Sequence, residues 1–366
     1  MNIKDLFPAI DDKTLTDILV YTNKETGLSM NILEKDLFIT GLITKIFQNE
    51  EIAKYLFFKG GTALAKCHHI TERFSEDADL FVFSGNPNAS RTQEVKYNQL
   101  VSNTISDMFP KDHVLDDNGN MLAKRGGDFN QIFISYDSVL DNNRFKPYLQ
   151  VEITSCSLKN KLNYAVDSRN KQLNSLIGEY LKTTNHAVAD KLDLHPISIT
   201  CVSAEKTLCD KISRLVRISY SEKPLEEAIK YIRDFYDMSM LLRAEQIKDY
   251  IASGKIIDDL LYVNKEDILR KNSHAEKDYS KALLFTDPSS IISNTRFQTE
   301  YASMVINMTF NPQKAPNLSE IIQTLSSLKE PLEHFDKIRT LTTNDINRHI
   351  EYYTKNEVIK PKTPKW

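Results

Sequence analysis

The sequence predicts an α+β protein in which an N-terminal domain with a small mixed sheet and flanking helices precedes an all-helical C-terminal domain. At 366 residues the chain is too long for one ordinary hydrophobic core, which indicates two domains. Before about residue 195, short apolar runs typical of strands alternate with helical patterns. From Ser203 onward the pattern is helical almost without interruption. We therefore expect one domain over residues 1–200 and a helical domain over residues 201–366.

Two helices are expected before the first strand. Apolar residues recur at helical spacing from about residue 11 to 24 and again from about residue 32 to 55. The residues that set this spacing are Leu15, Ile18, Leu19, Ile32, Leu33, Leu37, Ile43, Ile46 and Phe47.

A short apolar strand that runs into a glycine turn follows these helices. The stretch Phe57–Leu64 reads Phe-Phe-Lys-Gly-Gly-Thr-Ala-Leu. Its first residues favour a strand and its last residues open a helix. The turn at Gly60, Gly61 and Thr62 would then present backbone N–H groups to an anion.

The next strand, Asp77–Phe83, begins fifteen residues after the glycine turn and carries two carboxylates. Alternation with a period of two places Asp77 and Asp79 on one side of the strand and Ala78 and Leu80 on the other. Two carboxylates on one side can reach one divalent cation. A phosphate-binding turn beside a metal-binding pair is what nucleotide chemistry requires.

The rest of the N-terminal domain is expected to hold a helix and a hairpin. A helix of roughly residues 92–108 precedes a segment rich in Asp, Asn and Gly at 116–128, which predicts a hairpin or a mobile loop. Residues 131–136 and 148–153 then predict two strands.

Glu152, in the second of these strands, is the third carboxylate to consider. Alternation places it opposite Val151 and Ile153, and a strand that follows a hairpin can lie beside the strand of Asp77 and Asp79. The three carboxylates would then share two magnesium ions, which lower the pKa of an attacking hydroxyl and neutralise charge on a transferring phosphoryl group. Taken alone, a strand glutamate is usually a solvated residue.

Composition and charge limit the class of protein. The chain is 41% hydrophobic and 27% charged, as in ordinary globular proteins, and its formal net charge is −3, so a polyanion would need a local basic face. The four cysteines lack metal-ligand spacing and indicate reduced intracellular thiols and a cytoplasmic protein. His68 and His69 have no suitably spaced third ligand, so no metal site is expected there. No secretion signal is expected, because residues 1–14 have no cationic end followed by an apolar core. No membrane span is expected, because no run approaches eighteen apolar residues.

The glycine turn and the acidic strand resemble the nucleotidyltransferase AbiEii/AbiGii toxin family, within the polymerase-beta-like nucleotidyltransferase superfamily. That family typically shows Lys-Gly-Gly-Thr followed by Arg-x-Ser-x-Asp-x-Asp-Leu, which this chain matches at Lys59–Thr62 and Arg73–Leu80. It also carries a downstream Glu-Lys and an Arg-Asp-x-x-Asp, which match Glu205-Lys206 and Arg233–Asp237. The resemblance covers roughly residues 40–245, and the C-terminal third matches nothing.

This resemblance implies an N-terminal polymerase-beta-like domain that transfers a nucleotide with the help of Mg²⁺. The residues implied in binding the NTP are Lys59, Gly60, Gly61, Thr62 and Ser75. Asp77 and Asp79, with Glu152 as a further candidate, would hold the metal. The helical domain would contribute Lys206 to steady the triphosphate and Asp234 to orient or deprotonate the acceptor hydroxyl.

The family pattern leaves open whether Lys206 or Lys211, and whether Asp234 or Asp237, faces the nucleotide. If residues 203–218 form one helix, Lys211 lies at the edge of its apolar stripe and Lys206 points to the opposite side. On the next helix the apolar stripe would consist of Ile229, Ile232 and Tyr236. The aspartates would then lie away from it, and a surface ion pair between Arg233 and Asp237 is the plain alternative.

The residues from 205 to 233 are weakly basic. The cations there are Lys206, Lys211, Arg214, Arg217, Lys223 and Lys230, with Arg233 at the end. They are expected to form either a stripe that binds triphosphate or RNA backbone, or an ordinary solvated helix pair.

Three classes of function compete. The preferred one, by resemblance, is the toxin of a bacterial toxin–antitoxin or abortive-infection pair, which modifies an RNA acceptor such as tRNA and has a cognate antitoxin as partner. The second is a small-molecule nucleotidyltransferase of the antibiotic-modifying kind, which gives no reason for the downstream Arg-Asp-x-x-Asp. The third is a noncatalytic protein that binds a partner through its helical part.

Overall fold

The computed structural model describes residues 1–85, 89–115, 127, 129–141, 145–155 and 171–340. The chain forms two compact units. Unit 1 consists of Met1–Thr207 together with Ala302–Ala315, and unit 2 consists of Leu208–Tyr301 together with the chain from Pro316. A small mixed sheet accompanied by many helices confirms the α+β prediction.

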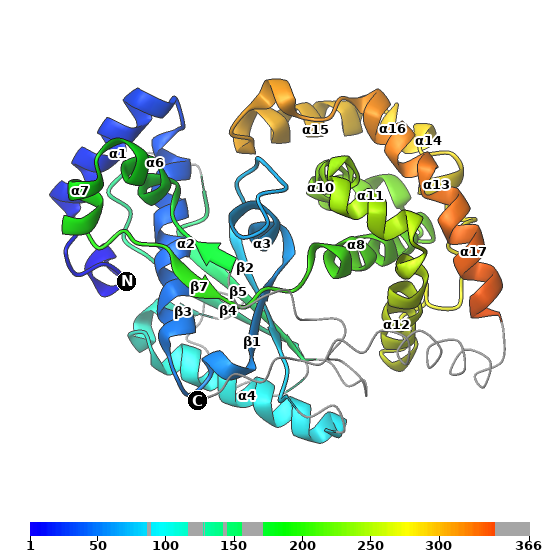
Figure 1. Ribbon diagram of the computed structural model, residues 1–366, viewed down its shortest axis with the longest axis horizontal. Helices are drawn as coiled ribbons and strands as arrows, with labels where there is room; N and C mark the ends of the chain where they lie inside the picture. The colour runs from blue at the N-terminus through cyan, green and yellow to red at the C-terminus, as the bar shows by residue number, and fades with distance from the viewer. Residues whose placement is uncertain (86–88, 116–126, 128, 142–144, 156–170, 341–366) are drawn as a thin grey trace. The chain divides into compact units, whose positions relative to one another are not determined.

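Among the described residues, a five-stranded sheet lies at the centre of unit 1 (Figure 1). Its strands are β1 (Leu56–Lys59), β2 (Asp77–Val82), β3 (Val114–Leu115), β4 (Phe129–Ser135) and β5 (Tyr148–Ser155), in the order β1-β2-β5-β4-β3. β2 and β5 run parallel, and the other neighbours run antiparallel. The two strands that the sequence predicts over 131–136 and 148–153 are present as β4 and β5, which pair with each other, and β5 lies beside β2. The short strands β6 (Lys171–Leu173) and β7 (Ile197–Ile199) pair separately.

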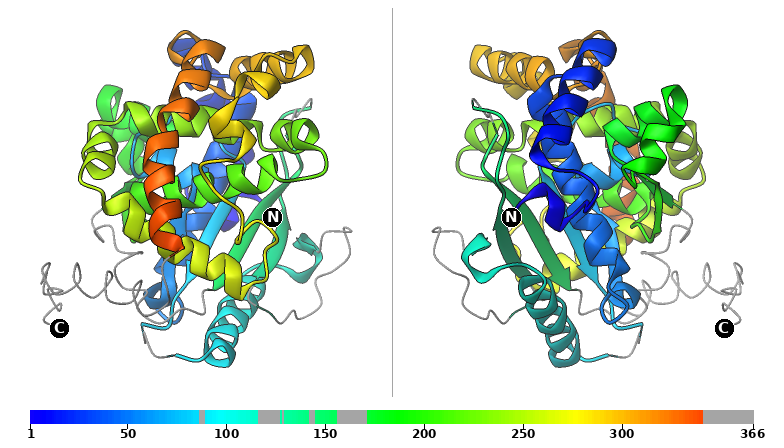
Figure 2. Two further views of the ribbon diagram at one scale, coloured as in Figure 1. Left: turned by 90° about the vertical axis from the view of Figure 1, so that its right-hand side faces the viewer. Right: turned by 90° about the vertical axis from the view of Figure 1, so that its left-hand side faces the viewer.

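Unit 1 also contains helices, some of which pack on this sheet. They are α1 (Asp12–Thr26), α2 (Met30–Gln48), α3 (Gly60–Lys66), α4 (Arg91–Asp107), α6 (Leu176–Thr184) and α7 (His186–Lys191). The helix expected to reach residue 55 ends earlier, at Gln48, and a separate 3₁₀ turn, η2 (Ala53–Tyr55), precedes β1. The helices α1, α2 and α6 pack on one another (Figure 2).

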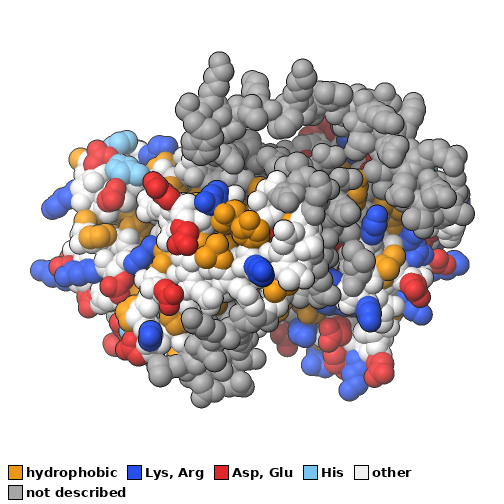
Figure 3. All heavy atoms as spheres, turned by 90° about the horizontal axis from the view of Figure 1, so that it is seen from below, with side chains coloured by type: hydrophobic (Ala, Val, Ile, Leu, Met, Phe, Trp, Pro, Cys, Tyr) orange, Lys and Arg blue, Asp and Glu red, His pale blue; other side chains and the backbone are white. Residues whose placement is uncertain are grey.

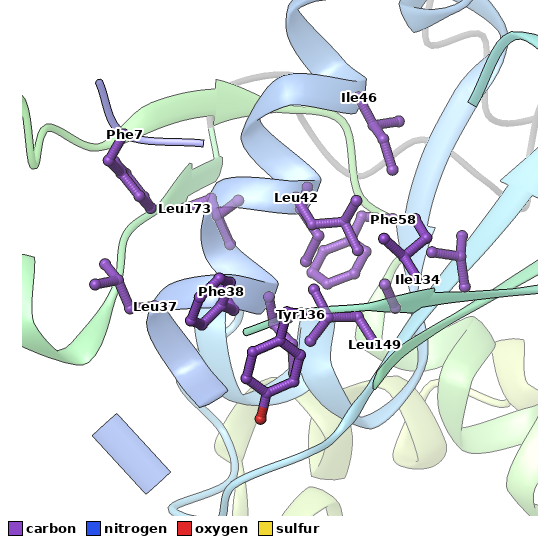
Figure 4. Packing of buried hydrophobic residues seen from close by; sticks show 14 of the residues in the cluster. Phe7, Leu37, Phe38, Leu42, Ile46, Phe58, Ile134, Tyr136, Leu149 and Leu173 are labelled. Atoms are coloured by element: carbon purple, nitrogen blue, oxygen red, sulfur yellow. The ribbon is translucent and has the colours of Figure 1, made fainter. Parts of the chain in front are cut away.

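The core of unit 1 lies between α2 and one face of the sheet. Leu42 and Ile46 of α2 point toward Phe58 of β1 and toward Ile134 and Leu149 of β4 and β5 (Figure 4). Burial alternates along β2 and β5, so every second residue of these strands joins this core. The residues in between are half-buried and face the other way, and Asp77, Asp79 and Glu152 are among them.

All regular elements described in unit 2 are helical. The helix α8 (Ala204–Ser219) begins in unit 1 and continues into unit 2, and α15 (Thr295–Met308) leads back to unit 1. The others are α9 (Pro224–Lys230), α10 (Ile232–Arg243), α11 (Glu245–Ala252), α12 (Lys255–Leu269), α13 (Leu283–Thr286), α14 (Ser289–Ile292), α16 (Leu318–Ser327) and α17 (Lys329–Arg339).

The return of residues 302–315 to unit 1 is not apparent from the sequence. The backbone N–H of Phe74 donates to the carbonyl of Met308 at 2.7 Å, and the N–H of Phe310 donates to the carbonyl of Glu72 at 2.8 Å. A late segment of the chain thus holds the loop that leads into β2.

No helix in the described ranges is long and apolar enough to cross a membrane. On the face seen from below, acidic and basic side chains are interspersed over the coloured surface (Figure 3). Most of the segment 116–128, for which the sequence predicts a hairpin or a mobile loop, lies outside the described residues.

Candidate functional site

Three carboxylates lie on two adjacent strands of unit 1. In the parallel register of β2 and β5, Asp79 is the partner of Glu152 and Asp77 is the partner of Gln150. Because the strands are in register, the alternation read from each strand places Asp77, Asp79 and Glu152 on the same face of the sheet. The expected neighbourhood of β2 and β5 is therefore present.

Glutamine side chains hold the carboxylate of Glu152. The Nε2 atoms of Gln131 and Gln150 donate to its Oε1 at 2.9 and 2.7 Å. Gln131 is the cross-strand partner of Glu152 on β4, and Gln150 is two residues before it on β5. Both amides orient the carboxylate, a role that the sequence alone did not indicate.

Gly60 brings the glycine turn directly against the acidic strand. Its φ is +78°, in the left-handed region that favours glycine, and Lys59 before it is the cross-strand partner of Asp79. A Cβ atom built on Gly60 would overlap the carboxylate of Asp79. Glycine is required here for two independent reasons, the backbone conformation and the space that Asp79 occupies.

Gly60→Ala is expected to destabilise unit 1 and to displace the Asp79 carboxylate. The left-handed conformation alone costs an alanine about 1–2 kcal/mol, and the overlap with Asp79 adds to that cost. Chemical denaturation measures the first effect, and nucleotidyl transfer measures the second. Gly27→Ala is the matched control, because Gly27 has φ of +73° but open space around its Cβ position. Equal losses of stability and activity in the two variants would contradict the contact with Asp79.

Thr62 and Ser75 line a cavity of about 250 Å³ in unit 1. The Thr62 hydroxyl donates to the backbone carbonyl of Asp77 at 2.5 Å, which ties α3 to the start of β2. Lys66 and Asp36, which also line the cavity, form a buried ion pair at 2.5 Å. Two of the residues implied in NTP binding thus border a cavity with both charged and apolar side chains in its lining.

Lys35, on α2, is a buried charged residue of unit 1 that the sequence analysis missed. Its side chain is fully buried and donates to the carbonyls of Lys146 and Tyr148, each at 2.5 Å. Burial lowers the pKa of Lys35 to about 8, although the negative charges of Glu76 and Asp77 oppose the shift. A lysine among apolar helix residues gave no sign of this in the sequence, because its partners are backbone carbonyls distant in the chain.

The lowered pKa of Lys35 predicts a pH-dependent difference between the protein and Lys35→Met. Between pH 8 and about 10.4, the unfolded state still binds the lysine proton that the folded state has lost, so this group makes stability rise with pH. The free energy of unfolding of the unmodified protein, relative to Lys35→Met, should therefore increase across this window by at most about 1.4 kcal/mol per pH unit. Urea denaturation of both proteins at pH 7, 8, 9 and 10 measures this difference in the free energy of unfolding. A difference that stays constant with pH would refute the prediction.

Lys206 lies in the first turn of α8, where the backbone continues from unit 1. The Ser203 side chain accepts from the N–H of Lys206 at 3.1 Å and so caps the start of this helix. The Lys206 side chain is half-buried. Lys211, five residues later in the same helix, is buried in unit 2.

Lys211 is the centre of a buried ion network. Its Nζ lies 2.5 Å from Asp234 Oδ1 and 2.8 Å from Asp237 Oδ2. Arg214 contacts the other oxygen of Asp234 at 3.1 Å. Burial raises the pKa of Asp234, but the charges of Arg214 and Lys211 outweigh burial and leave that pKa below its ordinary value.

The expectation that Asp234 and Asp237 lie away from the buried side of their helix is wrong. The helical structure is interrupted at Tyr231, between α9 and α10. Ile229 and Ile232 therefore lie on different helices and do not share one apolar stripe. In α10 both aspartates are buried, Asp237 completely. The ion pair of Asp237 with Lys211 is therefore a core contact and not the surface pair considered as the plain alternative.

The donor set on β2 fits a divalent cation that also binds substrate phosphates. Over the described ranges no three His, Cys, Asp or Glu side chains are grouped so that they could hold a metal by themselves. Mg²⁺ in nucleotide sites is commonly bound by one or two carboxylates plus phosphate oxygens. Asp77 and Asp79, on one face and beside the glycine turn, match that pattern.

The chain matches one family model and is similar in fold to a solved structure. The family model described as nucleotidyl transferase AbiEii toxin, type IV TA system, matches residues 42–324. No curated protein matches the chain. Among solved structures, the chain is similar to MenT4, a nucleotidyltransferase toxin from Mycobacterium tuberculosis H37Rv. The two are 13% identical with a TM-score of 0.50, over 95% of this chain and 99% of that chain, which is a likeness of fold.

Proposed function

Since the chain belongs to the AbiEii nucleotidyltransferase toxin family of type IV toxin–antitoxin systems, we propose that it transfers a nucleoside monophosphate from an NTP to a hydroxyl of an RNA, in a magnesium-dependent reaction. The observation that carries the proposal is the placement of Gly60 directly against the carboxylate of Asp79. It brings a phosphate-binding turn and a metal-binding pair together within one unit.

In this reaction the acceptor hydroxyl oxygen bonds to the α-phosphorus of the NTP. The bond between that phosphorus and the oxygen bridging to the β-phosphate breaks, pyrophosphate leaves, and the proton of the acceptor hydroxyl passes to solvent. A magnesium ion held by Asp77 and Asp79 would supply positive charge that neutralises the phosphates. Such catalysis consists mostly of positioning and electrostatic stabilisation.

The residues of this chain are assigned the following roles in the proposal. Asp77 and Asp79 hold the metal, with Glu152 beside them on β5. The turn residues Lys59, Gly60, Gly61 and Thr62, together with Ser75, contact the triphosphate, and Lys206 steadies it.

The ion network of unit 2 bears on the role proposed for Asp234 toward the acceptor hydroxyl. The lowered pKa makes Asp234 a weak proton acceptor, which favours orientation of the acceptor hydroxyl over its deprotonation. Lys211 and Asp237 are assigned to holding Asp234 in place. Arg233, which is half-buried, stays an additional candidate for substrate contact.

Incubation with each of four α-labelled NTPs tests the proposal. The acceptors offered in separate reactions are total bacterial RNA, a set of aminoglycosides and protein. Label that enters RNA, with tRNA as the expected band, supports the proposal. Label that enters an aminoglycoside would assign a small-molecule nucleotidyltransferase, and no transfer to any acceptor would leave a partner-binding protein.

The cellular part of the proposal is that of a cytoplasmic toxin held in check by a cognate antitoxin. Expression of the chain alone should then arrest bacterial growth, and the antitoxin gene should restore it. Among the described residues, Cys67, Cys201 and Cys209 are buried and form no disulfide, which suits a reducing compartment.

A further inference from the structure

Three cations surround one tyrosine in unit 2. The guanidinium carbons of Arg214 and Arg217 and the Nζ of Lys230 each lie 5.2 Å from the ring centre of Tyr231. Arg214 and Arg217 are three residues apart on α8, Lys230 ends α9, and Tyr231 is the break between α9 and α10. We call these four residues the Tyr231 cluster.

The positive charge of this cluster is only partly neutralised within the protein. Arg214 contacts Asp234, whose charge is shared with Lys211. Arg217 and Lys230 are exposed, and within the described part of the chain neither forms an ion pair with a carboxylate. Like charges held around one ring repel each other, so the arrangement costs stability unless an anion binds there.

We propose that the Tyr231 cluster binds the phosphodiester backbone of the RNA acceptor. This inference rests on the proposed transfer to RNA, and it locates one surface of the acceptor in unit 2. Tyr231 is a positioning residue in this account. Its ring holds three flexible side chains by cation–π contacts, so less conformational freedom is lost when phosphates bind.

The exposure of the cations favours a polyanion over a single nucleotide. Exposed cations gain little from one mononucleotide in water, whereas contacts along a nucleic-acid backbone release condensed counterions. The chain as a whole is not basic, with a net charge of −3, so attraction of RNA has to come from a local group such as this one.

Salt titration of RNA binding measures these contacts directly. The probe is a fluorescently labelled single-stranded RNA oligonucleotide, and its Kd is measured by anisotropy from 50 to 300 mM KCl. Each lost phosphate contact reduces the slope of log K against log salt by about 0.7 for single strands. The double variant R217Q/K230Q should therefore lower the magnitude of the slope by about 1.4.

Substitutions of Tyr231 separate its positioning role from the charges. Tyr231→Phe keeps the ring face and should keep the RNA affinity and slope, whereas Tyr231→Leu should weaken binding with all three cations still present. The matched control is Y220L/K277Q, since exposed Tyr220 and Lys277 form a pair with a single cation, 5.9 Å from the ring centre. This control should bind RNA like the unmodified protein.

The inference is overturned if R217Q/K230Q keeps the slope of the unmodified protein. It is also overturned if the cluster variants lose affinity for magnesium-NTP instead of RNA, which would make the cluster a nucleotide site. A third contrary result is that polyglutamate displaces the labelled RNA as well as unlabelled RNA does, which would indicate an acidic protein partner. Its failure is distinguishable from that of the proposed function. If the protein transfers nucleotide to RNA but the cluster variants bind RNA like the unmodified protein, only the inference is refuted. If RNA binding depends on the cluster but no transfer to RNA occurs, only the proposed reaction is refuted.

Discussion

Asp79→Ala is expected to reduce nucleotidyl transfer by roughly a thousandfold or more while the protein stays folded. Loss of a metal-holding carboxylate removes several kcal/mol of charge stabilisation from the transition state, and about 4 kcal/mol corresponds to that factor. Asp79 is half-buried, and its side chain points away from the apolar core, so no large cavity forms. The rate of label transfer from the preferred α-labelled NTP is the measurement.

Two further variants make this result specific. Asp79→Asn keeps the size of the side chain, so its equal inactivity would attribute the loss to the charge. Asp17→Ala removes an exposed carboxylate from α1 of the same unit and should be fully active. If Asp79→Ala retains more than about a tenth of the transfer rate of the unmodified protein, the assignment of Asp79 as a metal ligand is wrong.

Lys211→Met is expected to lower the free energy of unfolding by about 3–5 kcal/mol, because it leaves buried carboxylates without their shared cation. Asp234 and Asp237 both lie within 2.8 Å of Lys211 Nζ, and Asp237 is completely buried. Urea denaturation followed by circular dichroism measures the change.

The combined variant K211M/D234N/D237N should recover part of the lost stability, since it removes the unpaired charges as well. Lys206→Met is the comparison within the same helix. Lys206 is half-buried, so its variant should lose transfer activity with a much smaller change in unfolding. A Lys211→Met protein as stable as Lys206→Met would show that the ion network contributes little.

The burial of Asp234 changes how variants of this residue have to be judged. The sequence predicts Asp234 away from the apolar stripe of its helix, where an alanine substitution costs little stability, but Asp234 is buried and ion-paired. Relief of growth arrest by Asp234→Ala therefore has two explanations, loss of catalysis and loss of folding. Asp234→Asn, which keeps the size and removes the charge, should be compared at equal soluble protein level.

Features set by neighbouring residues were predictable from the sequence. The alternation of β2 places Asp77 and Asp79 on one face, and the glycine turn leads into α3, as expected. The strands β4 and β5 are also present where the sequence predicts strands. These features depend on steric preferences within a few residues, and a single sequence contains that information.

The prediction of which helix side is buried was wrong where one helical pattern was continued across two separate helices. Ile229 and Ile232 predicted one stripe, yet Tyr231 ends α9 before α10 begins, so the buried side of α10 includes both aspartates. Propensity alone does not place such a break, because the packing of each helix on its neighbours decides it.

By itself the sequence determined the α+β class, the family, and the glycine and carboxylate residues that nucleotide transfer requires. These depend on short motifs and on periodicity. Only the tertiary structure decided which groups meet. It paired Lys211 with two aspartates more than twenty residues away, set Gly60 against Asp79, and tied Glu152 to two glutamines. The physical reason is that charge pairing, burial and steric contact act through space, and their energies depend on distances that no local sequence pattern encodes.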